Sequence, residues 1–406
     1  NRMTRTWDEI VRRLARFGLL LIVRRLRHGT LDVVFSDGTP QRLTGVPATP
    51  VARIDVLDPG DMLGRIVRGG GVGFAEAYLH GSWTTPDLAD LLEVAAMNHD
   101  AHRRSGPLEG LLEFGRSGWA RLNRIAHPAR VKTMGEHYNL GNEFYATWLD
   151  PSMTYSSALY GDPTESLETA QRRKYQAIAR RAGVRRGGSV LEIGCGWGGF
   201  AEYAATEIGA RVTALTLSAE QEAYVRRRME LAGVSDLVEV RHLDFRHLSG
   251  TYDAVVSIEM IESVDETVWP ELFATIAGSL EPGGRAAMQA ITIQDDLYES
   301  LLRREEFIKR YIFPGGALPS LAVLRHLTAE NGLEWVEAES HGDSYALTLA
   351  SWSERFAKAW QRIIESSPRF DDRFRRMWEY YLAYCEAGFR TGRIDGYQIA
   401  LAKPVV

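Results

Sequence analysis

The stretch Val190-Leu191-Glu192-Ile193-Gly194-Cys195-Gly196-Trp197-Gly198-Gly199-Phe200 decides the fold of this chain. A short apolar run containing an acid comes first, a turn with four glycines follows, and the residues from Phe200 onward have the composition of a helix. Glycine allows a backbone to turn tightly and to approach a ligand closely. The stretch therefore predicts a strand, a glycine turn and the N-terminus of a helix.

The spacing of the glycines narrows the type of ligand. The turn has no Gly-Lys-Ser/Thr ending, so it does not match a phosphate-binding P-loop. Gly194-x-Gly196-x-Gly198 also lacks the third spacing of a dinucleotide fingerprint. The turn instead resembles the Glu-x-Gly-x-Gly loop of S-adenosylmethionine-dependent methyltransferases, in which the loop contacts the amino-acid end of the cofactor.

Apolar strands alternate with helices on both sides of this turn. The alternation predicts an α/β domain with a doubly wound, mostly parallel sheet that is buried on both faces. In such sheets ligands bind beyond the carboxyl ends of the strands. The predicted strands are 189–193, 211–216, 238–242, 252–258, 284–290, 333–336 and 397–401.

The bulk composition is that of a globular enzyme. The 406 residues are 45% hydrophobic and 25% charged, and a net charge of −5 gives no argument for nucleic acid binding. Two cysteines, Cys195 and Cys385, make neither a disulfide framework nor a metal site, and a reducing compartment is expected. The longest apolar run, Phe17 to Val23, is too short to cross a bilayer. These features predict a cytoplasmic enzyme that can touch a membrane face.

The chain divides by pattern into two domains. Residues 1–100 predict a small α+β domain, 101–130 a linker, and 131–406 the cofactor domain with a helical cap insertion at about 294–320. A helix predicted at Trp7 to Arg27 is amphipathic and basic. Such a helix suits either an anionic membrane surface or packing with a solvated arginine face.

Longer motifs resemble one family, the cyclopropane fatty acid synthases, from about residue 130 to the end. The motifs are Tyr138-Asn139-Leu140-Gly141-Asn142-x-Phe144-Tyr145, Leu149-Asp150-Pro151-Ser152-Met153-Thr154-Tyr155-Ser156, the glycine turn, Met260-x-Glu262, Tyr311-Ile312-Phe313-Pro314-Gly315, and Tyr380-Tyr381-Leu382-x-Tyr384-Cys385. The first domain resembles the additional N-terminal domain of the bacterial enzymes.

The resemblance implies a fold and a reaction. The fold is a Rossmann-like class I methyltransferase domain with a seven-stranded sheet. The reaction is attack of a cis double bond, in an acyl chain of a membrane phospholipid, on the methyl group of S-adenosylmethionine. The resulting carbocation closes a cyclopropane if the new methyl group loses a proton. It gives a methyl-branched or methylene chain if a neighbouring carbon loses the proton.

The cofactor residues follow from the motifs. Tyr155 and Ser156 are expected at the methionine moiety, and Gly194 and Gly196 permit close backbone approach. The remaining expected cofactor residues lie at the ends of the second and third strands, with Phe245 stacking on the adenine; they are Thr216, Leu217, Gln221, Asp244 and Phe245.

The proton acceptor is where the sequence departs from the family. Cyclopropane-forming members hold bicarbonate as the base with a cysteine, a glutamate, a histidine and a tyrosine. Glu262 and Tyr345 match two of these positions, whereas the cysteine position is Ser157 and the histidine position is Gln289. Serine and glutamine still donate hydrogen bonds, so bicarbonate stays one candidate base, and Glu262 with a raised pKa is the other.

Further residues complete the expected site. Tyr155, Tyr311, Phe313 and Tyr345 are aromatic faces that can stabilise a carbocation. Cys385 matches a family cysteine near the pocket and is expected to be a small buried residue.

Two other readings of the chain remain open: a methyltransferase for a soluble small molecule, and a non-catalytic lipid-binding module. The family implies a phospholipid bilayer as partner, at the inner face of the membrane, and in many members a homodimer.

Overall fold

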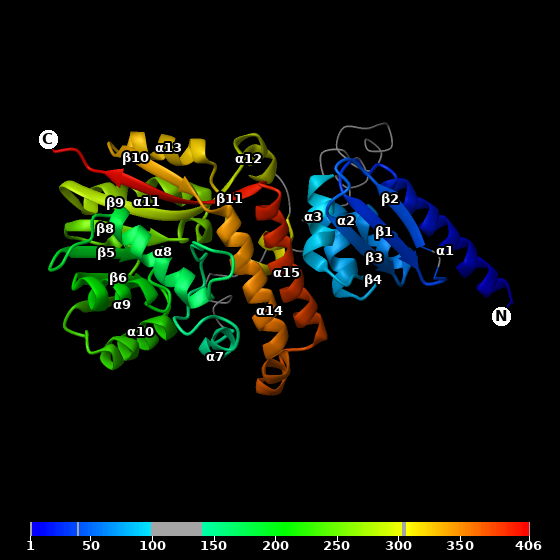
Figure 1. The fold of residues 1–406 in the computed structure, drawn as a ribbon, viewed down its shortest axis with the longest axis horizontal. Coiled ribbons are helices and arrows are strands. Elements are labelled where there is room, and N and C mark those ends of the chain that lie inside the picture. The colour runs from blue at the N-terminus through cyan, green and yellow to red at the C-terminus, as the bar shows by residue number, and fades with distance from the viewer. Residues whose placement is uncertain (1, 39, 99–139, 303–305, 406) are drawn as a thin grey trace. The chain divides into compact units, whose positions relative to one another are not determined.

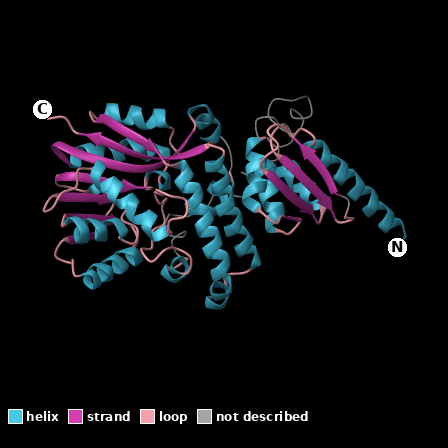
Figure 2. Cartoon of the chain, in the orientation of Figure 1, coloured by secondary structure: helices cyan, strands magenta, loops and turns pink. Residues whose placement is uncertain are grey.

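The computed structural model describes residues 2–38, 40–98, 140–302 and 306–405. These residues form two compact units (Figures 1 and 2). The first unit comprises residues 1–131, 305–312 and 367–391, and the second comprises 132–304, 313–366 and 392–406. Residues 101–130, predicted to be a linker, lie outside the described ranges.

The first unit is an α+β domain built on a four-stranded sheet in the order β2-β1-β3-β4. In this sheet β1 pairs antiparallel with β2, while β1 and β3 are parallel. The elements of the unit are α1 (Arg2–Val23), β1 (Thr30–Phe35), β2 (Pro40–Thr44), β3 (Val51–Val56), α2 (Pro59–Leu79), β4 (Trp83–Thr84), α3 (Leu88–Met97), a short helical turn at Ile308–Ile312, and α15 (Asp372–Arg390).

The membership of α15 and of residues 305–312 differs from the predicted domain boundary at residue 131. Tyr380 of α15 packs its ring 5.8 Å from that of Tyr78 on α2. Arg390, at the end of α15, donates a hydrogen bond of 2.9 Å to Asp90 on α3. The predicted cap at 294–320 is divided in the same way, since only its middle part groups with the first unit. These contacts join residues about 300 positions apart, so local sequence patterns do not predict them.

The second unit is the predicted doubly wound α/β domain. Its described residues form a seven-stranded sheet in the order β10-β11-β9-β8-β5-β6-β7, with helices on both faces (Figure 1). The strands are parallel except β11, which is antiparallel to both of its neighbours. The strands are β5 (Ser189–Ile193), β6 (Arg211–Thr216), β7 (Val238–His242), β8 (Tyr252–Ile258), β9 (Leu280–Ile293), β10 (Glu334–Ser340) and β11 (Ile394–Ala402).

Helices and short turns connect these strands. The helices are α7 (Asn142–Ala146), α8 (Leu167–Arg181), α9 (Gly199–Tyr203), which continues as a π-helical turn at Ala204–Ile208, α10 (Ala219–Ala232), α11 (Trp269–Ser279), α12 (Asp295–Leu302), α13 (Leu321–Glu330) and α14 (Gly342–Ser366). Short 3₁₀ turns occur at Phe245–His247, Ile261–Ser263 and Glu266–Val268. Among the described residues, no helix has both the length and the apolar character needed to cross a membrane.

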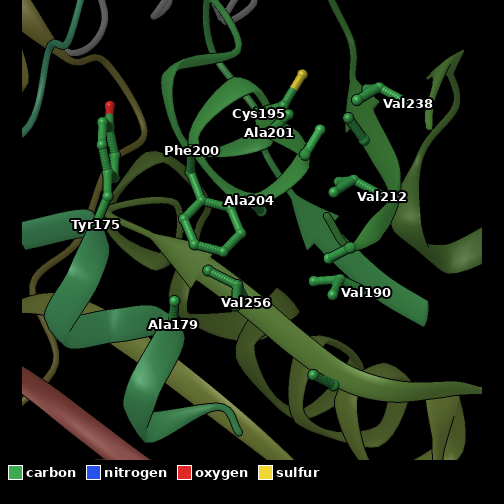
Figure 3. Packing of buried hydrophobic residues seen from close by; sticks show 14 of the residues in the cluster. Tyr175, Ala179, Val190, Cys195, Phe200, Ala201, Ala204, Val212, Val238 and Val256 are labelled. Carbon is green, nitrogen blue, oxygen red and sulfur yellow. The ribbon is translucent and has the colours of Figure 1, made fainter. Parts of the chain in front are cut away.

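The sheet is buried on both faces, which explains the continuous apolar run of β5. Val190 belongs to a core shared with α8 and α9, whereas Leu191 and Ile193 belong to the core on the opposite face. Figure 3 shows the first of these cores, with the ring of Phe200 among side chains from α8 and the strands. Alternate residues of a strand point to opposite faces, so Glu192 shares the face of Val190.

Candidate functional site

The glycine turn after β5 has the backbone that its sequence predicted. Gly194, Gly196 and Gly198 all have positive φ angles, of 82°, 51° and 81°. At Gly194 a Cβ atom would lie only 2.7 Å from Cγ of Met260. The turn therefore requires glycine for its conformation and, at Gly194, also for the close approach of the residues that follow β8.

A cavity of about 180 Å³ lies next to this turn, beyond the carboxyl ends of β5, β6 and β8. Its wall contains every residue predicted to bind the cofactor except Asp244. The carboxylate of Asp244 instead accepts hydrogen bonds from Arg246, at 3.0 and 2.7 Å, and this pairing holds its pKa below the usual value. The role predicted for Asp244 at the adenine stays a prediction.

Two polar side chains define the far end of the cavity. The hydroxyl of Thr216 donates a hydrogen bond of 2.8 Å to the side-chain oxygen of Gln221, and both residues are buried. In the glycine turn, a Cβ added at Gly196 would meet no described atom within 4 Å, so the turn is open to a ligand there. The cavity thus offers an open backbone cradle and a polar end, which fits a cofactor with an amino-acid part and a nucleoside part.

The segment that carries Tyr155 and Ser156 is held from two sides. From α8, Gln171 donates to the carbonyl of Ser156 at 2.9 Å, and Nζ of Lys174 donates to its hydroxyl at 2.7 Å. The ring of Tyr155 packs against Trp148 and Trp352, with centroids 5.6 and 5.4 Å away. Of the four aromatic residues predicted to stabilise a carbocation, Tyr155 lines the cavity.

Glu259, which the sequence reading did not single out, lies at the centre of the predicted catalytic residues. One oxygen of its carboxylate accepts hydrogen bonds from the backbone N–H of Ser157 and from the amide of Gln289, both at 2.9 Å. The other oxygen accepts a hydrogen bond of 2.7 Å from the hydroxyl of Tyr345. Glu259 also lines the cavity.

The backbone of Glu259 is unusual as well. Its φ angle is +48°, in a region that residues other than glycine rarely occupy. Such strain persists only where surrounding contacts fix the conformation, and it is concentrated at functional sites. The three hydrogen bonds to the carboxylate provide that fixation.

Glu262, the predicted base, has a different environment. One carboxylate oxygen accepts a hydrogen bond from the backbone N–H of Ile291. The other oxygen is buried and has no hydrogen-bond partner in the part of the chain that the structure describes. Burial, followed by the charge of Glu259, raises the pKa of Glu262 to about 8. At neutral pH this group is therefore mostly a protonated acid.

Burial also raises the pKa of Glu259, but its hydrogen bonds from Gln289, Tyr345 and Ser157 and the charge of Lys174 oppose that rise. Lys174 is fully buried, and burial lowers its pKa to about 7. Burial raises the pKa of Glu192 on β5 to about 8, and the charge of the same lysine opposes that rise. Perturbed pKa values of this kind are typical of functional sites.

The groups predicted to hold bicarbonate are already engaged. The hydroxyl of Ser157 donates to the carbonyl of Ala158 at 2.9 Å, not toward Glu259. Both N–H groups of the Gln289 amide are used, one by Glu259 and one by the carbonyl of Ser157 at 3.1 Å. The donors present therefore fit the carboxylate of Glu259 and leave little hydrogen-bonding capacity for a separate anion.

The other predicted catalytic residues lie in different places. The backbone carbonyl of Phe313 accepts a hydrogen bond of 3.1 Å from the N–H of Gly316, and the next residue, Ala317, donates to the backbone carbonyl of Glu262 at 3.2 Å. Tyr311 and Cys385 belong to the first unit. There the hydroxyl of Tyr311 donates to Glu76 at 2.7 Å, and burial raises the pKa of the Cys385 thiol to about 12. Their roles in catalysis stay predictions.

The sequence contained one signal for Glu259. It directly follows β8, a central strand, and stands three residues before Glu262. Two acids at the carboxyl end of one strand indicate a site. Lys174 gave no comparable signal, because a lysine on a long helix is normally solvated.

Comparisons with known proteins agree with this geometry. The sequence model of the family described as "Mycolic acid cyclopropane synthetase" matches residues 126–399. The chain is 39% identical to a tuberculostearic acid methyltransferase of Mycobacterium tuberculosis, over 94% of the chain and 90% of that protein. It is 33% identical to the cyclopropane-fatty-acyl-phospholipid synthase of Escherichia coli, over 87% and 88%.

Solved structures give the same result. A mycolic acid cyclopropane synthase complexed with SAH and CTAB superposes with a TM-score of 0.63 at 26% identity. The match covers 68% of this chain and 99% of that one.

Proposed function

Because the chain belongs to the mycolic acid cyclopropane synthetase family and is an S-adenosylmethionine-dependent methyltransferase, we propose that it methylates the cis double bond of an unsaturated acyl chain in a membrane phospholipid. The observation that carries the proposal is the cavity between the glycine turn and Glu259, which joins a cofactor cradle to an aromatic wall and a buried carboxylate.

The cofactor supplies an electrophilic methyl group on a positively charged sulfur. Gly194 and Gly196 hold its amino-acid end through close backbone approach, and Gln221 with Thr216 faces its nucleoside part. Tyr155, ordered by Trp148 and Trp352, forms the wall along which the methyl group and the alkene are aligned. An alkene is a poor nucleophile, so its alignment with the methyl group must supply much of the rate.

The reaction has two steps, methyl transfer to the alkene and loss of a proton. The π electrons of the double bond form the new carbon–carbon bond, the sulfur–methyl bond breaks, and its electron pair stays on sulfur. The positive charge passes to the neighbouring carbon of the chain, where the faces of Tyr155, Tyr345 and Phe313 stabilise it. Loss of a proton then leaves an electron pair that closes a ring or forms a new double bond.

We place the methyl-branched product, in which a neighbouring chain carbon loses the proton and a double bond stays in the chain, ahead of the cyclopropane. Ser157 and Gln289 replace the residues expected of ring-forming members. The relative whose match covers 94% of this chain, at 39% identity, is named a methyltransferase and not a cyclopropane synthase. The cyclopropane is the second candidate, supported by the name of the family and of the Escherichia coli relative.

The test is analysis of the lipids of cells that express the full chain. The two products are isomers, so mass alone does not separate them. Ozonolysis cleaves the methyl-branched alkene to a fragment that carries the added methyl group, and it leaves the cyclopropane intact; a cyclopropane has characteristic ring-proton resonances in NMR. Methyl-bearing ozonolysis fragments support the methyl-branched product, ring resonances support the second candidate, and lipids without an added methyl group refute the whole proposal.

The acceptor lipid requires contact with a membrane, and α1 offers a surface for it. Leu14, Phe17 and Leu21 are 65%, 58% and 44% exposed and are spaced along one side of the helix. Exposed arginines, including Arg13 and Arg24, lie near these apolar side chains in the sequence. An amphipathic helix with exposed apolar and basic side chains binds anionic lipid surfaces. We place the enzyme on the inner face of the membrane on this basis.

Point substitutions test this surface better than a truncation does. The opposite side of α1 packs through Leu19 and Leu20, so removal of the helix would expose a core. The combined variant Leu14→Ser, Phe17→Ser and Leu21→Ser should reduce binding to anionic phospholipid vesicles at least about tenfold. Sedimentation with vesicles measures the effect, and unchanged binding would remove the assigned role of α1.

A further inference from the structure

The carboxylate of Glu259 occupies the place at which the three groups expected to hold an anionic base converge. Ser157 through its backbone, Gln289 through its amide and Tyr345 through its hydroxyl all donate to it. These groups come from a loop and from β9 and α14, which are far apart in the sequence. A site built from distant segments around one carboxylate is specific to that carboxylate.

We propose that Glu259 is the proton acceptor of the methylation reaction, built into the chain in place of a bound bicarbonate ion. The proposal deepens the function proposed above and rests on it. After methyl transfer, one oxygen of the carboxylate takes the proton from the carbon next to the cationic centre. The electron pair of that carbon–hydrogen bond neutralises the cation, and Glu259 becomes a neutral acid that later releases the proton to solvent.

The geometry favours Glu259 over Glu262 as the proton acceptor. Three donors stabilise the ionised form of Glu259, whereas among the described residues Glu262 has one donor and a buried oxygen without a partner. Hydrogen bonds to a carboxylate favour its charged form, and desolvation without them favours the protonated form. Glu259 also lines the cavity beside Tyr155 and the glycine turn, where the reacting carbon must lie.

The strained backbone supports the same conclusion. A glutamate at a φ of +48° aims its side chain in a direction that a relaxed residue at this position would not reach. The N–H of Glu259 is fixed in turn by a hydrogen bond of 2.8 Å to the carbonyl of Gln289. Backbone and side chain are thus both held by the same residue of β9.

The test compares four forms of the full-length enzyme: wild type, Glu259→Gln, Glu259→Gly and, as a control, Glu330→Gln, which changes an exposed glutamate on α13. Each is incubated with vesicles of an oleoyl phospholipid and methyl-labelled S-adenosylmethionine, in buffer freed of carbon dioxide and in the same buffer with added bicarbonate. Calorimetric cofactor binding and the far-UV circular dichroism spectrum show whether each variant is folded.

The wild type and Glu330→Gln should incorporate label equally with and without bicarbonate. Glu259→Gln should lose on the order of 10² to 10⁴ in turnover, the usual contribution of a general base, with cofactor affinity within about threefold of wild type. Glu259→Gly leaves a gap the size of a carboxylate at a backbone position that glycine adopts readily. Added formate or bicarbonate should restore part of its turnover in a saturable way.

Two results would overturn the inference: turnover of Glu259→Gln at the wild-type level, or a wild-type enzyme that loses most of its rate when bicarbonate is removed. A merely structural role for Glu259 predicts loss of cofactor binding together with turnover, and no rescue by anions. If the wild type transfers no label to lipid, the proposed function itself fails. Label transfer by wild type and Glu259→Gln alike refutes the inference alone.

Discussion

The close approach of Met260 to the glycine turn leads to a quantitative prediction for Gly194→Ala. An alanine there would keep a left-handed φ of 82°, which costs roughly 1–2 kcal/mol for an L-residue. Its Cβ would also lie 2.7 Å from Cγ and 3.2 Å from Cβ of Met260. Forcing such a neighbour aside costs about 1–3 kcal/mol in a packed region. We therefore expect a loss of roughly 2–5 kcal/mol in the free energy of unfolding.

Gly196→Ala is the matched control. Gly196 has a φ of 51°, but no atom of the described part of the chain lies within 4 Å of the Cβ that would be added. Only the backbone strain of about 1–2 kcal/mol applies to it. The difference between the two variants isolates the contact with Met260, and the double variant Gly194→Ala with Met260→Ala should remove that difference.

The assay is urea unfolding followed by tryptophan fluorescence, together with calorimetric titration of the cofactor. The midpoint should fall in the order wild type, Gly196→Ala, Gly194→Ala, and the Met260→Ala background should bring the two glycine variants together. Equal midpoints for the two alanine variants, or no coupling between positions 194 and 260, would refute the reasoning that this glycine is required by a backbone–side-chain contact.

Two further predictions concern the buried charges. Burial raises the pKa of Glu262 from 4.5 to about 8, so the folded state holds its proton more tightly than the unfolded state. The stability this gives is present below pH 4.5 and is lost as the pH rises toward 8, by at most about 5 kcal/mol at roughly 1.4 kcal/mol per pH unit. Glu262→Gln should flatten this decline in unfolding midpoints measured from pH 5 to 8, and an unchanged slope would contradict the assignment. Lys174→Met removes a positive charge that lowers the pKa of Glu259, so the acidic limb of the pH–rate profile should move to higher pH; an unmoved limb would show that the lysine does not act on the base.

The strands of the second unit could be predicted because the signal is local. A buried parallel strand is a continuous apolar run between turn residues, and β5, β6 and β8 were found within a residue of their observed ends.

The domain division could not be predicted, for a different reason. α15 has an amphipathic pattern that would suit packing on either unit. Its packing on α2 and α3 depends on contacts between residues about 300 positions apart in the sequence. Arg390 hydrogen-bonds to Asp90, and the ring of Tyr380 packs against that of Tyr78. A pattern along one helix states which face is apolar, not which surface covers it.

The site was predicted as a set of positions but not as a charge arrangement. Ser157, Gln289 and Tyr345 were identified by resemblance, while the group that joins them is Glu259. The methyl donor and the expected intermediate are both cations, so a buried carboxylate held by three fixed donors complements the charge before and after methyl transfer. Lys174, with a pKa lowered to about 7, is partly neutral at physiological pH and so opposes those cations less than an exposed lysine would. The strain at Glu259 agrees with this role, because the chain holds a carboxylate in a conformation better suited to glycine at a place where a fixed negative charge serves both steps.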